Sequence, residues 1–191
     1  MLSVVIATHD SERALLPTLS ALVAGAVAGL VREVIVADAA SRDATVTIAD
    51  GAGCRVLAST QSRGMRLSAA AQAARASWVL FLQAGVVLEP SWVEETGRFM
   101  EDAERRRHDY AAVFSVETSP PGARNAMALL RAALGVRPDS TGGLLIARAL
   151  YDRIGGHRDL KEPERDLLRR LGRRQLKRLR TRAEYLTKSK I

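Results

Sequence analysis

The amino-acid sequence predicts an α/β fold in which a mostly parallel β-sheet carries helices on both faces. Within residues 2–76, three consecutive units each join a short apolar run to a helical pattern, and a fourth apolar run follows at residues 78–82. Strands of a parallel sheet are buried on both faces and therefore read as runs of β-branched and aliphatic residues. Repeated strand–helix units are typical of such a sheet covered by crossover helices.

Each element expected in the first half follows from its own residues. "LSVVIAT" is rich in β-branched residues, and the helix after it has Leu15, Leu19 and Leu22 at helical spacing. Glycines end the second helix, and the third is rich in alanine. The expected strands are residues 2–8, 33–38, 54–59 and 78–82. The expected helices are residues 11–25, 42–53 and 63–76.

The second half of the chain is less regular. The expected elements are a helix at 91–107 with Ser91 as its N-cap, a strand at 110–118, a helix at 123–134, a strand that enters a short helix at 142–150, and a basic helical segment from about Pro163 onward.

The positive charge is concentrated at the C-terminal end. The 191 residues have a net charge of +8, but residues 165–190 alone carry a net charge of +9 and residues 1–164 a net charge of −1. We therefore expect a domain over residues 1–160 and a basic amphipathic helical tail over 161–191.

The single cysteine, Cys54, excludes an internal disulfide framework and fits a reducing compartment. Met1 leads directly into "SVVIAT" without a basic n-region, so no signal peptide is expected. The longest apolar stretch, residues 21–31, is too short to span a bilayer. A cytoplasmic location is expected.

A ligand site is expected at the carboxyl ends of the strands, where loops and helix N-termini converge. In the second of these loops, "ADAASRDAT", Asp38 is well placed to accept hydrogen bonds from a ribose or a base N–H. Ser41 and Asp43 either share that role or cap the next helix. No GxGxxG or Walker-type loop follows any strand, which argues against a dinucleotide enzyme or a P-loop NTPase.

Three segments together resemble the nucleotide-sugar half of the inverting GT-A glycosyltransferases of family 2. They are "SVVIATHDSERALLPTLSAL", "REVIVADAASRDAT" and "SRGMRLSAAAQAARASWVLFLQAG". The second loop of this family usually reads Asp-Gly-(Gly/Ser)-Ser-x-Asp-x-Thr, which is matched by Asp38, Ser41, Asp43 and Thr45. Arg63 and Gly64 match an Arg-Gly pair in the third loop, and residues 142–160 resemble the segment that leads to the acceptor-side acid.

The resemblance implies a GT-A-like, Rossmann-like fold that holds a UDP- or GDP-type sugar under the first four loops. It places Arg63 within reach of a phosphate; the alternative is a solvated residue at a helix start. The other donor-side residues that it implies are Thr8, Asp10, Glu12, Asp38, Ser41 and Asp43.

The metal motif of the family is altered in this sequence. The family's fourth strand ends in Asp-x-Asp, whose carboxylates hold Mg²⁺ or Mn²⁺ against the diphosphate, but Gln83 and Gly85 stand at these positions. Neutral groups attract a divalent cation far less than two carboxylates do. We therefore expect no Mg²⁺ or Mn²⁺ and weak or no metal dependence. His157 and Arg158 are candidates to supply the missing positive charge.

The acceptor-side acid of the family is usually an Asp that acts as general base. Here "KEPERD" offers Glu164 and Asp166, and the spacing to Gly172 differs from the usual pattern. The base is Glu164, Asp166 or neither. The alternative is that both acids stabilise a helix N-terminus.

The C-terminal segment is a candidate for binding an anionic membrane surface, peripheral to the inner face. The alternative is an amphipathic helix that packs on the domain with its basic face in solvent. Nucleic acid is not expected, because no motif that reads DNA or RNA accompanies the charge. The residues expected on the apolar face of this helix are Leu168, Leu171, Gln175, Leu179, Ala183 and Leu186.

Two functions are consistent with these features. The first is transfer of a sugar from a nucleotide-diphosphate sugar to an unknown acceptor, which the well-formed donor half favours. The second is a non-catalytic relative that binds a nucleotide sugar or a partner protein, which the missing Asp-x-Asp favours. A nucleotidyltransferase is a weaker option, because the first loop, "ATHDSERA", lacks glycines.

Overall fold

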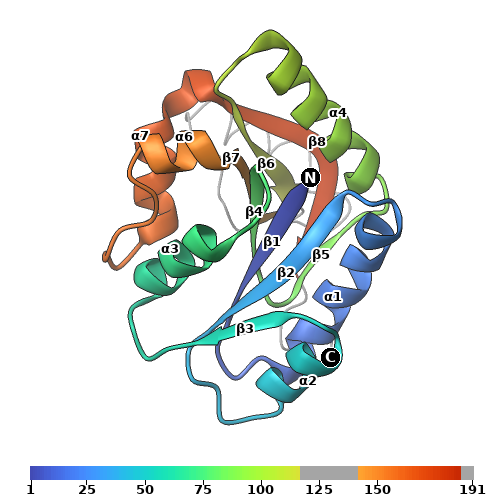
Figure 1. Cartoon of the computed structure of the whole chain (residues 1–191), viewed down its shortest axis with the longest axis vertical. Helices are drawn as coiled ribbons and strands as arrows, with labels where there is room; N and C mark the ends of the chain where they lie inside the picture. The colour runs from blue at the N-terminus through green and yellow to red at the C-terminus, as the bar shows by residue number, and fades with distance from the viewer. Residues whose placement is uncertain (117–141, 186–191) are drawn as a thin grey trace, which may run out of the picture.

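The computed structural model describes residues 1–116 and 142–185 (Figure 1). In these residues, eight strands form one sheet in the order β3-β2-β1-β4-β7-β6-β8-β5. The strands are β1 (Leu2–Thr8), β2 (Val31–Asp38), β3 (Arg55–Ala58), β4 (Trp78–Gln83), β5 (Val86–Leu88), β6 (Ala111–Val116), β7 (Leu144–Ala147) and β8 (Leu176–Tyr185). The helices are α1 (Glu12–Val27), α2 (Thr45–Gly51), α3 (Arg63–Ala73), α4 (Trp92–Arg106), α6 (Arg148–Arg153) and α7 (Pro163–Gln175).

The sheet confirms the predicted α/β fold. Strands β3, β2, β1 and β4 run parallel to one another, as the strand–helix units of the first half predict. The pair of β6 and β8 is also parallel, whereas β7 pairs antiparallel with β4 and β6, and β5 antiparallel with β8.

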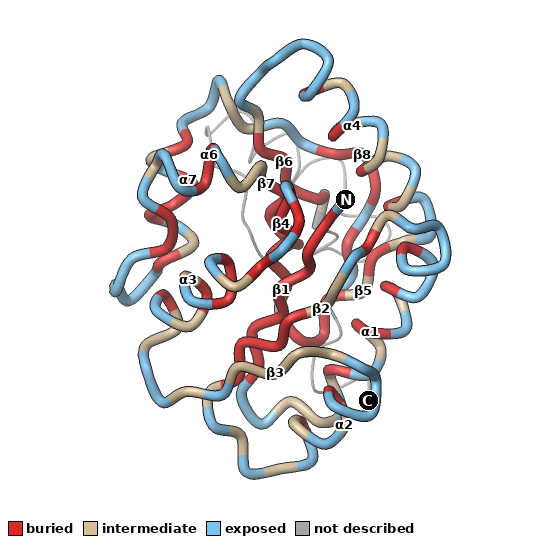
Figure 2. The backbone as a smooth tube through the Cα atoms, viewed as in Figure 1, coloured by how far each residue is buried: buried red, intermediate tan, exposed pale blue. Residues whose placement is uncertain are grey.

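Helices cover both faces of this sheet. Along β1, Val4 and Ile6 pack in one apolar cluster with residues of α1, α2 and α4, whereas Val5 and Ala7 pack in a second cluster with residues of α3, α6 and α7. The period-two alternation of a strand separates these two sets of side chains. Figure 2 shows the buried strands between helices whose outer sides are exposed.

The C-terminal segment differs from the expected helix. Residues 176–185 form strand β8, which lies between β6 and β5 in the sheet. Leu179, Thr181 and Ala183 are buried and the residues between them are exposed, a period of two. Gln175, Leu179 and Ala183 are four residues apart, a spacing that fits one face of a strand as well as one face of a helix. Thr181 distinguishes the two readings, because a helix would not bury it with Leu179.

The apolar face expected to lie on a membrane packs inside the protein. Leu168 and Leu171 of α7 join the cluster that contains α3 and α6, and Leu179 and Ala183 of β8 join the opposite cluster. Leu186 lies outside the described residues. Among the helices of residues 1–116 and 142–185, none combines the length and apolar character that a bilayer span requires.

Other expected elements differ in detail. The strand expected at 110–118 is described as far as Val116, and the helix expected at 123–134 lies outside the described residues. Ser91 precedes α4 but does not cap it with its side chain; its hydroxyl lies 3.2 Å from the hydroxyl of Thr181 in β8.

Candidate active site

The first four loops meet at one edge of the sheet, as predicted. In the parallel register Thr8 of β1 lies beside Asp38 of β2, and Ala7 of β1 lies beside Gln83 of β4. Since parallel strands end at the same edge, the loops after β1, β2, β3 and β4 lie together there.

Asp38 is fully buried at the end of β2. Its carboxylate accepts hydrogen bonds from the hydroxyl of Thr8 (2.7 Å), and from the hydroxyl (2.6 Å) and backbone N–H (2.7 Å) of Ser41. Burial raises the pKa of this carboxyl, but the bonds from Ser41 and Thr8 and the nearby Arg66 outweigh burial and hold the pKa below its ordinary value. Asp38 is therefore ionised, and in this structure it organises its own loop.

The first and second loops are joined by reciprocal hydrogen bonds between side chains and backbone, an arrangement that we call the loop clasp (residues 8–12 and 38–45). Backbone N–H groups donate from Asp10 to Ser41 Oγ (2.9 Å), from Ser11 to Thr45 Oγ1 (2.7 Å), from Glu12 to Asp43 Oδ2 (3.0 Å), from Arg42 to Asp10 Oδ1 (2.8 Å) and from Ala44 to Glu12 Oε2 (3.2 Å). Asp43 also accepts from the N–H of Thr45 (3.0 Å), so it caps the starts of both α1 and α2.

Arg63 and Glu164 form an ion pair, although 101 residues separate them in the sequence. The Nε of Arg63, at the start of α3, donates to Oε1 of Glu164, at the start of α7, over 2.5 Å. The side chains are 35% and 21% exposed, so solvent reaches both. The donor-side arginine and an acceptor-side acid of the sequence prediction therefore lie together.

Close backbone contact fixes the starts of α3 and α7 relative to each other. A Cβ atom on Gly64 would lie 1.9 Å from the backbone oxygen of Arg158 and 3.1 Å from Cβ of Pro163. Only glycine allows this approach. The Arg158 side chain itself is exposed.

Asp166 is poorly suited to act as a general base. It is 7% exposed, and its two oxygens accept hydrogen bonds from Arg169 and Arg170, each over 2.8 Å. The hydrogen bond from Arg169 has the largest effect and lowers the pKa of this carboxyl. The hydrogen bond and the charge of Arg170 lower it further, whereas burial opposes the shift. Arg170 also donates to the backbone oxygens of Ile154 and Gly156. Asp166 thus orients a guanidinium that holds the loop after α6.

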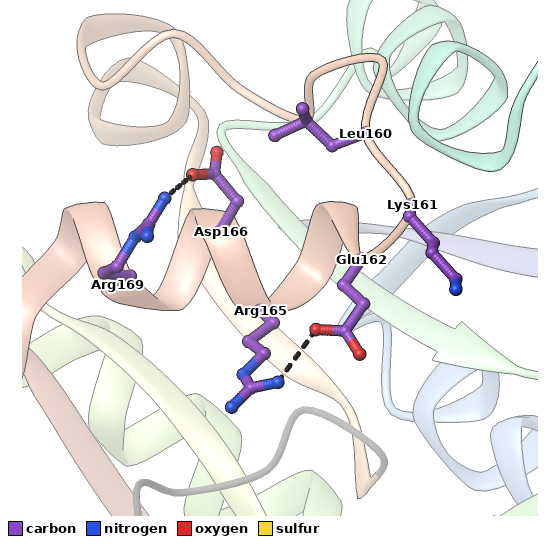
Figure 3. Close-up of a pocket in the computed structure, with 6 residues that line it drawn as sticks. All are labelled: Leu160, Lys161, Glu162, Arg165, Asp166 and Arg169. Carbon is purple, nitrogen blue, oxygen red and sulfur yellow. Dashed lines mark hydrogen bonds and ion pairs between the residues drawn. The ribbon is translucent and has the colours of Figure 1, made fainter.

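A hollow of about 450 Å³ lies beside the first turns of α7 (Figure 3). Its two acids are paired with arginines of the same helix, Glu162 with Arg165 (2.9 Å) and Asp166 with Arg169. Glu164 is not part of the lining, because it points toward α3. The lining residues are Leu160, Lys161, Glu162, Arg165, Asp166 and Arg169.

His157 is not the cationic group that the sequence suggests. Its side chain is 4% exposed, its Nδ1 lies 2.9 Å from the hydroxyl of Tyr151, and its ring packs edge-on against Phe81. Burial lowers the pKa of His157 to about 4; Glu164 opposes this shift, and Arg63 adds to it. The imidazole is therefore neutral at pH 7, and the expected positive charge there is wrong for His157.

The fourth loop turns its backbone into the protein. Gln83 is half-buried at the end of β4. Gly85 is buried with a φ of +95°, and its N–H lies 3.0 Å from the backbone oxygen of Ala14 and 2.9 Å from the hydroxyl of Thr18. A glycine suits this position because a side chain is strained at such a φ.

Sequence reasoning missed Arg66, one turn after Arg63 in α3. The positive charge of Arg66 helps to lower the pKa of Asp38, and it repels the charge of Arg63. The Nη1 of Arg66 donates to the backbone oxygen of Gln61 (2.5 Å). The spacing of the two arginines in "RGMR" was the available signal, since residues three apart share a helix face.

A mostly parallel sheet with polar loops gathered at the carboxyl ends of its strands defines a GT-A-like α/β protein. Residues 3–156 match the family model "Glycosyl transferase family 2", and the chain belongs to this family. No curated protein matches the sequence.

Solved structures of two glycosyltransferases have a similar fold. Glucosyl-3-phosphoglycerate synthase from Mycobacterium tuberculosis, in complex with Mn²⁺ and UDP-glucose, is 21% identical, with a TM-score of 0.74 over 98% of this chain and 72% of that chain. TarS 1-349 of S. aureus, in complex with UDP-GlcNAc, is 16% identical, with a TM-score of 0.71 over 97% of this chain and 59% of that chain.

These structures correct the expectation that Mg²⁺ or Mn²⁺ is unlikely. The mycobacterial synthase contains Mn²⁺ together with UDP or UDP-glucose, and this finding overturns the expectation. Within residues 1–116 and 142–185, no three His, Cys, Asp or Glu side chains gather into a ligand set, and Gln83 and Gly85 offer no carboxylate. The described residues alone therefore do not supply a ligand set that fits the ion.

Proposed function

We propose that the protein transfers a sugar from a nucleotide-diphosphate sugar of the UDP or GDP type to an acceptor hydroxyl. Membership of glycosyl transferase family 2 carries this proposal. The presence of UDP or UDP-sugars in the similar synthase and TarS structures supports the choice of donor. The donor would occupy the loops at the carboxyl ends of β1, β2, β3 and β4.

Glu164 is the better candidate for the general base. Its carboxylate is partly exposed, whereas both oxygens of Asp166 are held by guanidinium groups. In the proposed step Glu164 takes the proton of the acceptor hydroxyl, and the oxygen attacks the anomeric carbon. The bond from that carbon to the diphosphate oxygen breaks, the nucleoside diphosphate leaves with the electron pair, and the configuration inverts.

The remaining residues position the donor. In this proposal the guanidinium of Arg63 binds phosphate oxygens in a bidentate manner and offsets the charge of the leaving group. The loop clasp keeps Thr8, Asp38 and Ser41 in fixed positions near the expected nucleoside. A ligand there meets a rigid framework, which lowers the entropy cost of binding.

Calorimetric titration with UDP and GDP in a buffer containing Mn²⁺ tests the donor site. We expect one of the two nucleotides to bind, and the corresponding nucleotide sugar to be hydrolysed slowly when no acceptor is present. Absence of binding by either nucleotide would contradict the proposal.

A non-catalytic relative is the second candidate, and the Gln83–Gly85 turn favours it. Gly85 directs its backbone N–H into the protein, and the carboxylate of Asp38 is already occupied by Thr8 and Ser41. Nucleotide binding without hydrolysis or transfer would select this alternative.

A further inference from the structure

The ion pair joins Arg63, which the proposed function assigns to the donor phosphates, to Glu164, which it assigns to the acceptor hydroxyl. We infer that the diphosphate of the donor and the carboxylate of Glu164 compete for the guanidinium of Arg63, so that donor binding releases Glu164 for the acceptor. This inference rests on the proposed function.

Glu164 is held by a guanidinium group. Among the described residues, Arg63 is its hydrogen-bond and ion-pair partner, at 2.5 Å. A carboxylate that accepts a short bond from a guanidinium has that oxygen occupied. Breaking this bond frees the carboxylate to turn that oxygen toward an acceptor hydroxyl.

A second guanidinium lies close to Arg63. Arg66 lies one turn further along α3, close enough for the two guanidinium groups to repel each other. Among the described residues, Glu164 supplies the carboxylate paired with Arg63, while Asp38 acts on Arg66. A diphosphate brings more negative charge than one carboxylate and matches the guanidinium fork in geometry. It is therefore able to replace Glu164 at this position.

The mobility needed for this exchange is confined to side chains. A Cβ on Gly64 would meet the Arg158 oxygen and Pro163, so the chain at the start of α7 passes closely against the start of α3. The paired side chains are 35% and 21% exposed, and a pair that solvent reaches is held only weakly. Rotation of the two side chains is enough to exchange partners.

Calorimetric titration of the wild type and four variants with UDP and GDP in the presence of Mn²⁺ tests the competition. We expect Glu164→Gln to bind the nucleotide about two- to fivefold more tightly than the wild type, because the competing charge is gone. Glu162→Gln is the matched control: it removes a carboxylate near the same helix start, but one paired with Arg165. We expect its affinity to equal that of the wild type.

The double substitution completes the cycle. Arg63→Gln is expected to weaken binding, and adding Glu164→Gln to it is expected to change the affinity no further. If the wild type binds nucleotide but Glu164→Gln binds equally or more weakly, or if its effect persists without Arg63, the competition is disproved and the proposed function stands. If the wild type binds neither nucleotide, both the function and the competition fail.

Discussion

Ala40, in the loop clasp, has a backbone conformation that disfavours alanine. Its φ is +55°, in the left-handed region, and its side chain is exposed. An L-residue with a Cβ pays about 1–2 kcal/mol in this region, and glycine does not. The family motif has Gly or Ser at this position, so the structure gives a backbone reason for the glycine.

Ala40→Gly is therefore expected to stabilise the protein by about 0.5–1 kcal/mol, after allowing for the greater entropy of glycine in the unfolded chain. Urea denaturation measures the effect. Ala26→Gly is the control: Ala26 is exposed within α1, where the same substitution should cost up to about 1 kcal/mol. Equal effects at the two positions would refute the backbone argument.

The buried His157 makes the free energy of unfolding depend on pH. Its folded-state pKa of about 4 lies below the ordinary value of 6.5, so the unfolded chain binds the proton more readily. The neutral imidazole contributes about 3 kcal/mol to the free energy of unfolding. This contribution is complete above about pH 6.5 and is lost as the pH falls toward 4. The charges that act on the ring are those of Glu164, Arg63 and Arg170.

His157→Phe is expected to remove this part of the acid sensitivity. Urea denaturation at pH 7 and at pH 4.5 would show a smaller loss of stability for the variant than for the wild type, while the carboxylates titrate alike in both. His157→Gln serves if the phenylalanine variant does not fold. An identical loss in wild type and variants would mean that the buried imidazole is not the group responsible.

At the scale of single elements, strand β8 shows where sequence patterns become ambiguous. The spacing of Gln175, Leu179 and Ala183 satisfies both a helix and a strand, and the arginines suit the exposed side of either. Thr181 is buried and donates to Glu95 of α4 from both its N–H (2.6 Å) and its hydroxyl (2.5 Å). This contact between distant segments leaves no trace in the local pattern.

Thr181→Asp is expected to destabilise the protein by at least about 2 kcal/mol, because it places a carboxylate at a buried position beside the carboxylate of Glu95. Thermal unfolding measures the loss. Arg178→Asp, at an exposed position of β8, is expected to shift stability by no more than about 0.5 kcal/mol. A tolerated Thr181→Asp would favour the helix that the sequence suggested.

At the scale of the whole molecule, the site forms from segments that the sequence locates but does not connect. The rule that ligands bind at strand carboxyl ends predicts the positions of the loops that contain Thr8, Asp38 and Gln83, and the structure brings these ends to one edge. The pairing of Arg63 with Glu164 depends on how α7 packs against α3. No periodicity or spacing records that packing.

Substitution of the two candidates for the general base is expected to affect different properties, activity for Glu164 and stability for Asp166. Glu164→Gln should lower sugar transfer or donor hydrolysis by about 10²- to 10⁴-fold while the melting temperature changes little. Asp166→Asn should lower the melting temperature, because Arg169 and Arg170 lose a buried charged partner. Normal turnover of the Glu164→Gln variant would exclude Glu164 as the base.

Because β8 lies between β6 and β5, the sheet cannot be completed before β8 has been synthesised. Val87 of β5 pairs with Glu184, which lies far along the chain, so this edge of the sheet forms only after the segment that contains β8 has been synthesised. Contacts between such remote segments slow folding, and unpaired strand margins invite association with other chains. Until β8 has been synthesised, β5 and β6 lack the partner with which they pair in the finished sheet, and we expect association with other chains to occur at these strands.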